Sequence, residues 1–147
     1  MHKLGIAAIS MLALAPAFAA DEAGTIKTSQ GQVQIERGAQ KLAATVGARV
    51  DVSDRISTGK DGSIGITLRD NTILSAGPNA VLELNKFAYN PSTQAGAIDV
   101  NVKKGSLAAI SGKVAKNNPD AVRFTTSAVT LGVRGTEFIL DAGQGEE

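Results

Sequence analysis

Carboxylates are almost the only side chains in this sequence that could carry acid–base chemistry. The chain of 147 residues has no cysteine and no tryptophan, and its one histidine is His2. Beyond His2 the sequence therefore offers no thiol nucleophile, no imidazole base and no Cys or His ligand for a metal. This inventory excludes zinc sites, haem ligation by His or Cys, and Ser-His-Asp catalysis.

Two carboxylate pairs have the spacing that invites a search for a general acid and base. Asp51 with Asp54, and Asp61 with Asp70, fall near expected turns. Spacing along the chain does not set the separation of roughly 5–10 Å that glycoside hydrolysis requires. We expect all four to be solvated turn residues, and the sequence predicts a protein that is not an enzyme.

Calcium binding is the other chemistry that these carboxylates could support. Asp51, Asp54 and Asp61 would supply the hard oxygen ligands that calcium prefers. The spaced Asp or Asn residues and the closing Glu of a calcium-binding loop are missing around them. We therefore expect no metal and no cofactor.

Arg134 and Thr136 stand in the most distinctive stretch of the chain, residues 130–138. An alternating apolar run is interrupted there by Gly132 and Gly135 and resumes at Phe138. Glycine within a strand pattern usually marks a bulge, a bend or a close backbone approach. The pattern predicts a corner between two half-buried strands that holds one cation and one hydroxyl, with the two glycines conformational and Phe138 in the core.

Two roles are open for this corner. Arg134 could present its guanidinium to a carboxylate of a partner or a ligand. It could instead pair with Asp70, with Asp141 or with a backbone carbonyl and fix the last hairpin, which is the alternative we favour. The hydroxyl of Thr136 could similarly bond the backbone of the turn.

Aromatic side chains, which usually build glycan-binding platforms, are few. Beyond the first 20 residues the chain has only Phe87, Tyr89, Phe124 and Phe138. Phe87 and Tyr89 alternate before a polar loop, so they share one face and could be exposed together. A peptidoglycan or glycan site at this pair is one alternative, although we expect at least one ring to lie in the core.

The first residues have the three parts of a secretory signal peptide. Lys3 supplies the basic start, and residues 4–15 form an apolar run of about 18 Å if helical, too short for a hydrocarbon core of ~30 Å. Small residues at Ala17 and Ala19 predict cleavage after Ala19. We expect a signal peptide at 1–19 and a single exported domain at 20–147, located in the periplasm or secreted.

Charge does not point to a nucleic-acid or membrane partner. The chain has 15 basic and 14 acidic residues, and the excess base disappears once Lys3 is removed. A balanced charge gives no general attraction to nucleic acid or to anionic lipid. After the apolar start no segment is long and apolar enough to span a membrane, so we expect no span after cleavage.

Apolar residues recur with period two along nearly the whole chain. Ile64, Ile66 and Leu68 alternate with small or polar residues, and the same pattern runs from Ile98 to Val102. Turn signals return about every 8–12 residues, which is typical of all-β folds. We expect short antiparallel strands in one domain, as a β-sandwich or a short β-solenoid, with Asp70–Asn71 as a two-residue hairpin turn.

Several segments, taken in order, resemble the FecR domain, the periplasmic module named after the ferric-citrate uptake regulator. The similarity covers residues 24–140. It rests on residues 24–26, 54–59, 62–72, 78–84, 104–107 and 132–138. The positions within these segments that we interpret as structural are Gly59, Asp70, Pro78, Asn79, Gly105, Gly132, Gly135 and Phe138.

The resemblance implies an all-β fold and a binding or sensing role outside the cytoplasm, in an envelope of the Gram-negative type. The best-known members of the family cross the inner membrane once and control a sigma factor from a cytoplasmic segment. This sequence shows neither a spanning helix nor a cytoplasmic portion, so we expect a free-standing exported form without that role.

The resulting hypothesis is a protein–protein interaction module of the cell envelope. A sheet edge, such as the strand expected at Ile98–Val102, could add a strand of the partner, and Arg134 with Thr136 could add specificity. The alternative is a binder of peptidoglycan or another glycan through Phe87 and Tyr89.

Overall fold

The computed structural model describes residues 22–133 and 135–144. The predicted cleavage site at Ala19 and the side chain of Arg134 lie outside these residues. The first strand begins at Glu22, directly after the undescribed segment. No helix among the described residues is long and apolar enough to cross a membrane.

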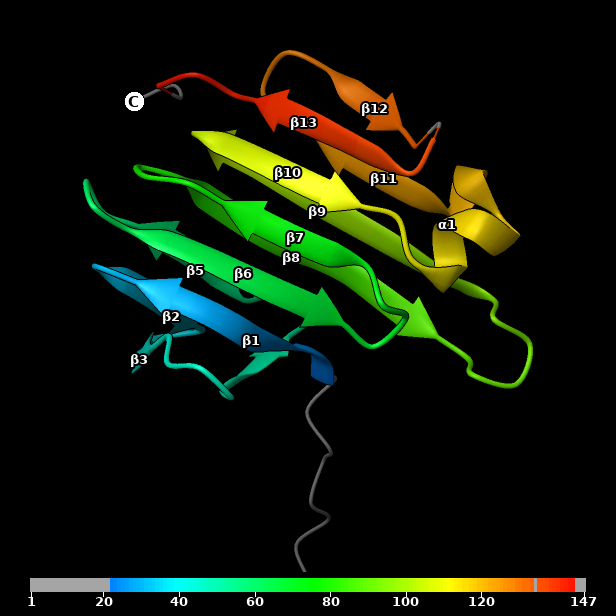
Figure 1. Cartoon of the computed structure of the whole chain (residues 1–147), viewed down its shortest axis with the longest axis horizontal. Helices are drawn as coiled ribbons and strands as arrows, with labels where there is room; N and C mark the ends of the chain where they lie inside the picture. The colour runs from blue at the N-terminus through cyan, green and yellow to red at the C-terminus, as the bar shows by residue number, and fades with distance from the viewer. Residues whose placement is uncertain (1–21, 134, 145–147) are drawn as a thin grey trace, which may run out of the picture.

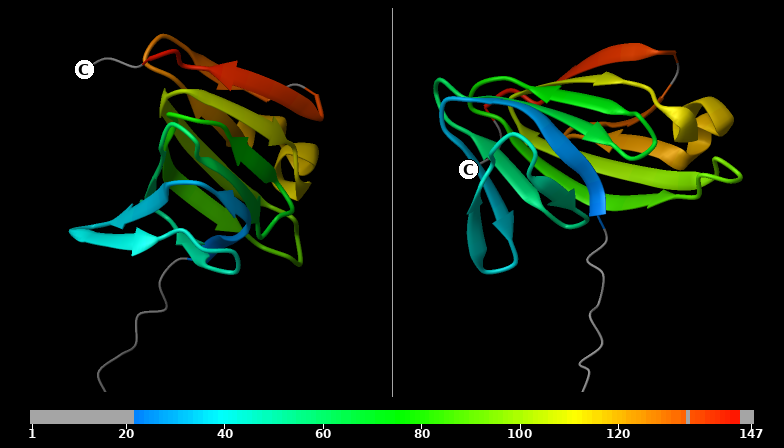
Figure 2. Two further views of the ribbon diagram at one scale, coloured as in Figure 1. Left: turned by 60° about the vertical axis from the view of Figure 1, so that its left-hand side comes forward. Right: turned by 60° about the horizontal axis from the view of Figure 1, so that its bottom comes forward.

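Thirteen strands of the described chain form two sheets that pack face to face, with one short helix at one end (Figures 1 and 2). The six-stranded sheet has the order β13-β10-β7-β6-β1-β4, and the seven-stranded sheet has the order β12-β11-β9-β8-β5-β2-β3. We call them sheet A and sheet B. The predicted all-β fold is confirmed, as a sandwich, although β9 and β11 pair in parallel and not antiparallel as we expected. Its strands are β1 (Glu22–Gln30), β2 (Val33–Arg37), β3 (Gln40–Ala43), β4 (Arg49–Asp51), β5 (Arg55–Thr58), β6 (Ser63–Leu68), β7 (Ile73–Ala76), β8 (Val81–Tyr89), β9 (Gly96–Lys104), β10 (Ser106–Ile110), β11 (Val122–Thr125), β12 (Thr130–Gly132) and β13 (Glu137–Asp141).

The period-two pattern explains the layers. In β6 every second residue is buried, namely Ile64, Ile66 and Leu68, and the residues between them are partly exposed. Successive side chains of a strand point to opposite faces, so one face of each sheet is apolar and the two apolar faces meet. Phe124 of β11, 1% exposed, contacts Phe138 of β13 edge to face, with ring centroids 4.9 Å apart.

The strand at Ile98–Val102 is not at a sheet edge. It belongs to β9, which lies between β8 and β11 in sheet B. Its polar residues alternate with buried ones because the outer face of a sandwich sheet meets solvent even at a central strand. The edge strands are β12 and β3 in sheet B, and β13 and β4 in sheet A.

The turn between β6 and β7 has three residues, Arg69 to Asn71, rather than the two that we predicted. The Leu68 N–H donates to the Thr72 carbonyl at 2.8 Å, and the Asn71 N–H donates to the Leu68 carbonyl at 2.9 Å. Asn71 has φ +70°. This is a turn followed by a left-handed residue, a common three-residue hairpin in which asparagine tolerates positive φ.

Candidate binding site

The Asp70 carboxylate organises one end of the sandwich. It is fully buried and accepts hydrogen bonds from the Thr72 N–H at 3.0 Å, the Thr72 hydroxyl at 2.8 Å and the Val114 N–H at 3.1 Å. Val114 belongs to the helix α1 (Lys113–Asn117), so this one side chain ties the β6–β7 turn to α1. Asp70 is therefore not the solvated turn residue that we expected, because its carboxylate is buried and bonded within the scaffold.

The residues after β10 connect this turn to the stretch that we call the closing motif, described at residues 132–133 and 135–138. At Gly112 an added Cβ would lie 2.4 Å from the Thr72 nitrogen and 2.5 Å from the Asp70 carbonyl oxygen. Ser111 donates its backbone N–H to the Thr136 carbonyl at 2.7 Å and its hydroxyl to the Gly135 carbonyl at 3.0 Å. The segment after β10 is thus held between the Asp70 turn and the closing motif.

The closing motif makes the connection between the two sheets. Gly135 has φ +110°, a conformation that L-residues rarely adopt. Gly132, which we also expected to be conformational, has no positive φ and open space around an added Cβ. Thr136 contributes its backbone carbonyl to the contact with Ser111, and its side chain is exposed. Phe138, which we expected in the core, is partly buried and packs against the core.

A groove of about 680 Å³ lies beside this connection. One wall is the closing motif with Ser111, and the other is α1 and the 3₁₀ turn that follows at Pro119–Ala121. Lys116 and Asp120 bring one charge of each sign to the second wall. The groove therefore brings together Gly132, Gly135 and Thr136, which we selected from the sequence as candidate residues. It also contains Lys116 and Asp120, which we did not select.

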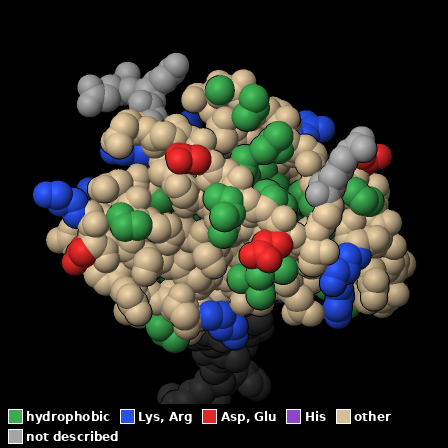
Figure 3. All heavy atoms as spheres, turned by 45° about the horizontal axis from the view of Figure 1, so that its top comes forward, with side chains coloured by type: hydrophobic (Ala, Val, Ile, Leu, Met, Phe, Trp, Pro, Cys, Tyr) green, Lys and Arg blue, Asp and Glu red, His purple; other side chains and the backbone are tan. Residues whose placement is uncertain are grey.

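The end of the sandwich next to the groove is apolar at its surface. Ile139 of β13 is 74% exposed, Leu131 of β12 is 39% exposed, and Val129 just before β12 is 51% exposed. Figure 3 shows apolar side chains gathered over this end. Residues 129–133 and 135–141 include β12 and β13, the edge strands of the two sheets here, and we refer to these residues as the closing edge.

The other family segments meet at the opposite end of β7. The Thr58 hydroxyl donates to the Gly77 carbonyl at 2.6 Å and accepts from the Ala80 N–H at 2.9 Å. Asn79, at φ +53°, donates its N–H to the Gly59 carbonyl at 3.0 Å, and the turn carries Pro78. Gly105, at φ +77°, packs so close to Ala80 that an added Cβ would lie 2.7 Å from the Ala80 Cα. These positions fix a corner of the scaffold.

Phe87 and Tyr89 do not form an exposed pair. Phe87 is 8% exposed and lies in the core cluster, with the Arg69 guanidinium carbon 5.2 Å from its ring centroid. Tyr89 is partly buried against the same core. Both side chains of the predicted glycan site therefore serve mainly to pack β8 onto the core.

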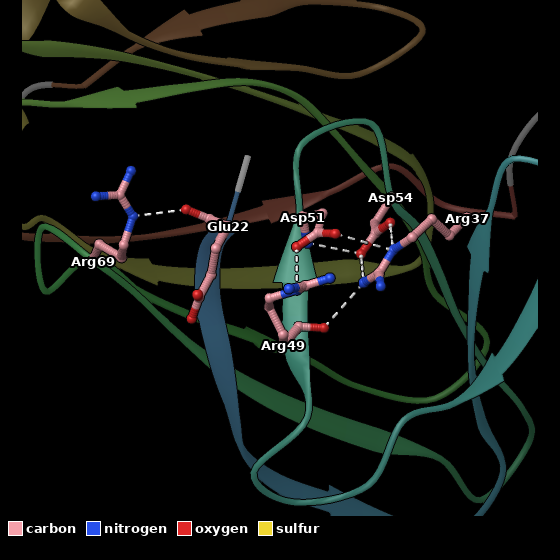
Figure 4. Close-up of polar contacts among 6 residues, drawn as sticks. All are labelled: Glu22, Arg37, Arg49, Asp51, Asp54 and Arg69. Atoms are coloured by element: carbon pink, nitrogen blue, oxygen red, sulfur yellow. Dashed lines mark hydrogen bonds and ion pairs between the residues drawn. The ribbon is translucent and has the colours of Figure 1, made fainter. Parts of the chain in front are cut away.

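Asp51 and Asp54 are buried in an ion-pair cluster instead of being solvated (Figure 4). Arg37 of β2 donates to both carboxylate oxygens of Asp54, at 2.9 and 2.8 Å, and the Asp51 N–H donates to the same carboxylate at 2.8 Å. Arg49 Nε lies 2.8 Å from Asp51 Oδ1, and Arg37 Nε lies 3.4 Å from Asp51 Oδ2. Two cations and two anions thus neutralise one another.

The electrostatics of this cluster act most clearly on Arg37. The hydrogen bond to Asp54 raises the pKa of the Arg37 guanidinium above its usual value. Partial burial lowers this pKa, and the negative charges of Asp54 and Asp51 raise it. Sequence reasoning missed Arg37 because it lies 17 residues from Asp54, and only the pairing of β2 with β5 brings the two together. No local motif signals that contact.

The FecR protein family model matches residues 54–146, which is most of the chain. The chain belongs to the FecR protein family. Neither a curated protein nor a solved structure matches it. The match includes the Asp70 turn, the corner at Asn79 and the closing edge. It begins at Asp54, so β1 to β4, including Arg37 and Arg49, precede it.

Proposed function

We propose that this FecR-family chain is a non-catalytic module that is exported to the periplasm or beyond and binds another protein of the cell envelope through its closing edge. The family, known from envelope sensing and signalling, supports the setting. The observation that carries the proposal is the exposure of Val129, Leu131 and Ile139 where both sheets end. Apolar side chains at an unpaired sheet edge favour association with another chain.

The buried carboxylates support a binding role over a catalytic one. Asp54 is occupied by Arg37, and Asp70 accepts three hydrogen bonds from its own turn and α1. Neither carboxylate lines the groove at the closing motif. General acid–base catalysis needs carboxyl groups within reach of a substrate proton. These two groups lack that access, and among the described residues only Asp120 brings a carboxylate to the groove.

Site-specific photocrosslinking in the producing cell tests the proposal. A photoreactive residue at position 131 should capture a distinct envelope protein, and the same residue at Val46, which is 64% exposed in the turn before β4, should not. The same protein captured from both positions, or nothing captured at 131, would contradict the proposal. Co-sedimentation with purified cell wall in place of capture would favour the glycan alternative.

Export is tested on the same cells. Fractionation should place the protein outside the cytoplasm, and mass spectrometry of the purified protein should find Ala20 as its first residue. A protein that retains Met1 and stays in the cytoplasmic fraction would contradict both the predicted signal peptide and the envelope setting.

A further inference from the structure

The hydrogen-bond pattern of β13 shows which of its backbone groups face outward. The Ser111 N–H donates to the Thr136 carbonyl, and the Ala142 N–H donates to the Gly105 carbonyl at 2.9 Å. Hydrogen-bonded and non-bonded pairs alternate along an antiparallel ladder. Between these two bonds, therefore, the even-numbered residues Phe138 and Leu140 direct their N–H and C=O groups toward β10.

The odd-numbered residues of β13 direct their backbone N–H and C=O groups away from β10. Glu137, Ile139 and Asp141 face the side of the strand on which sheet A has no further member among the described residues. Their side chains are also the exposed ones of the strand. The open edge of β13 thus presents backbone groups that have no strand partner among the described residues. At alternate positions it carries an acidic, an apolar and an acidic side chain.

At the closing edge, sheet B extends one strand further than sheet A does. The contact of Phe138 with Phe124 places β13 over β11. The next strand of sheet B, β12, therefore has no strand of sheet A opposite it in the part of the chain that the structure describes. Leu131 pairs with Phe124 across the ladder and so points to the inner face, yet it is 39% exposed. One further strand on β13 would cover Leu131.

Charge argues against a second copy of this chain as that strand. Antiparallel pairing of two β13 strands about Ile139 would set Glu137 of one copy opposite Asp141 of the other, twice. Like charges directly opposite one another destabilise a strand pair, and opposite charges stabilise it. The edge is therefore complementary to a strand with basic residues at both flanking positions and unfavourable for itself.

We propose that β13 accepts an extended segment of a partner protein as a seventh strand of sheet A, and that this segment carries Lys or Arg two residues before and two residues after an apolar residue. The basic side chains lie opposite Glu137 and Asp141, and the apolar one lies opposite Ile139. The residues between them face inward and cover Leu131. This mode of binding rests on the proposed function, because it specifies how the closing edge holds its partner.

Titration of the ¹⁵N-labelled protein with synthetic peptides tests the proposal. The probe is Thr-Lys-Val-Ile-Val-Lys-Thr, and the matched control replaces both lysines by glutamate. The lysine peptide should shift the amide signals of Glu137, Ile139, Asp141 and Leu131, and should slow hydrogen exchange at the odd-numbered amides of β13. With two charge pairs reversed, the glutamate peptide should bind about tenfold more weakly or worse.

Charge exchange on the protein completes the experiment. The double variant Glu137→Lys/Asp141→Lys changes only exposed side chains, and its fold is checked by circular dichroism. It should prefer the glutamate peptide. Equal binding of the two peptides, no binding up to millimolar concentration, or shifts confined to other strands would overturn the proposal.

These outcomes are separate from those of the photocrosslinking. A partner that is still captured at position 131 by the charge-exchanged variant would overturn strand addition and leave the proposed function standing. Absence of any captured protein would contradict the proposed function itself, whatever the peptides do.

Discussion

Asp54 shows what a buried charge requires of its neighbours. Its side chain is fully buried, and Arg37, whose side chain is 29% exposed, holds both carboxylate oxygens. Removing one partner of a buried ion pair is strongly destabilising, because the other charge stays buried without compensation. The pair is therefore a vulnerable point of the scaffold.

Arg37→Ala should lower the free energy of unfolding by about 3 kcal/mol, because Asp54 would lose its cation in the interior. Arg37→Lys should recover only part of this, because an ammonium cannot contact both oxygens as the guanidinium does. Urea unfolding followed by circular dichroism measures both variants. Arg55→Ala is the control and should cost much less, because the Arg55 side chain is 46% exposed and lies 3.7 Å from the partly exposed Glu83.

The pH dependence of this contact follows from the raised pKa of Arg37. A group whose pKa is higher in the folded protein stabilises the fold fully below its unfolded pKa, and loses that contribution as the pH rises through the folded value. For an arginine this range lies on the strongly alkaline side, above the ordinary pKa of the guanidinium. The contribution of Arg37 should therefore stay constant in unfolding experiments at neutral and mildly alkaline pH.

Asp70→Ala should lower the free energy of unfolding by about 2 kcal/mol, because two backbone N–H groups and the Thr72 hydroxyl lose their acceptor. The matched control is Asp61→Ala, an exposed turn residue that accepts a hydrogen bond at 3.3 Å from the Gln32 N–H. Thermal unfolding compares the two. A loss of stability as large in the control would show that Asp70 has no special role.

The roles of single acidic residues were the least predictable part of the sequence. Asp51, Asp54 and Asp70 resembled solvated turn residues, yet all three are buried. Burial of an aspartate depends on donors that other strands bring to it, such as Arg37 and the Val114 N–H. These donors are distant along the chain, so local patterns carry no signal for them.

At the scale of the elements, the closing connection depends on one glycine. Gly135→Ala should destabilise the protein by more than about 1 kcal/mol, since φ +110° is strained for any residue with a Cβ. Gly132→Ala is the control, because an added Cβ there meets no atom within 4 Å and the backbone has no positive φ. Equal melting temperatures for the two variants would contradict the prediction.

At Gly112 the constraint is steric, because there is no room for a side chain. Its φ is −100°, but an added Cβ would lie within van der Waals distance of the Asp70 turn backbone. Gly112→Ala should therefore displace α1 from the turn and cost about 1–3 kcal/mol, as overpacking does. Hydrogen exchange of the Val114 amide measures the displacement directly. Gly77→Ala, in open space, should leave that amide protected.

The positions of the strands could be predicted from the sequence, but the order in which they pair within the sheets could not. Alternation identified β6 and β9 because each has one face in the core and one in solvent. Which strand lies at an edge depends on long-range pairing, and β9 was therefore placed wrongly. The glycines and the proline of the family segments marked real corners, but the groove and the missing strand opposite β12 arise only when the sheets stack.

At the scale of the whole molecule, the acidic residues of β13 protect an open edge from self-pairing. Replacing both with neutral strand-forming residues, in Glu137→Thr/Asp141→Thr, should promote association of two copies through β13. Sedimentation velocity should then show a dimer or larger species at concentrations where the parent protein is monomeric. The variant Ile139→Lys, which keeps the edge charged, should not associate.

The path of sheet A also determines how the molecule bears tension. Four successive antiparallel pairings, from β1 through β6, β7 and β10 to β13, leave β1 and β13 running in the same direction. Glu22 therefore begins at one end of the sheet and Asp141 finishes at the other (Figure 1). A pull between these two points acts along the strands, perpendicular to the hydrogen bonds that join them. The ladders of sheet A are then loaded in shear, all bonds at once, instead of being unzipped one pair at a time.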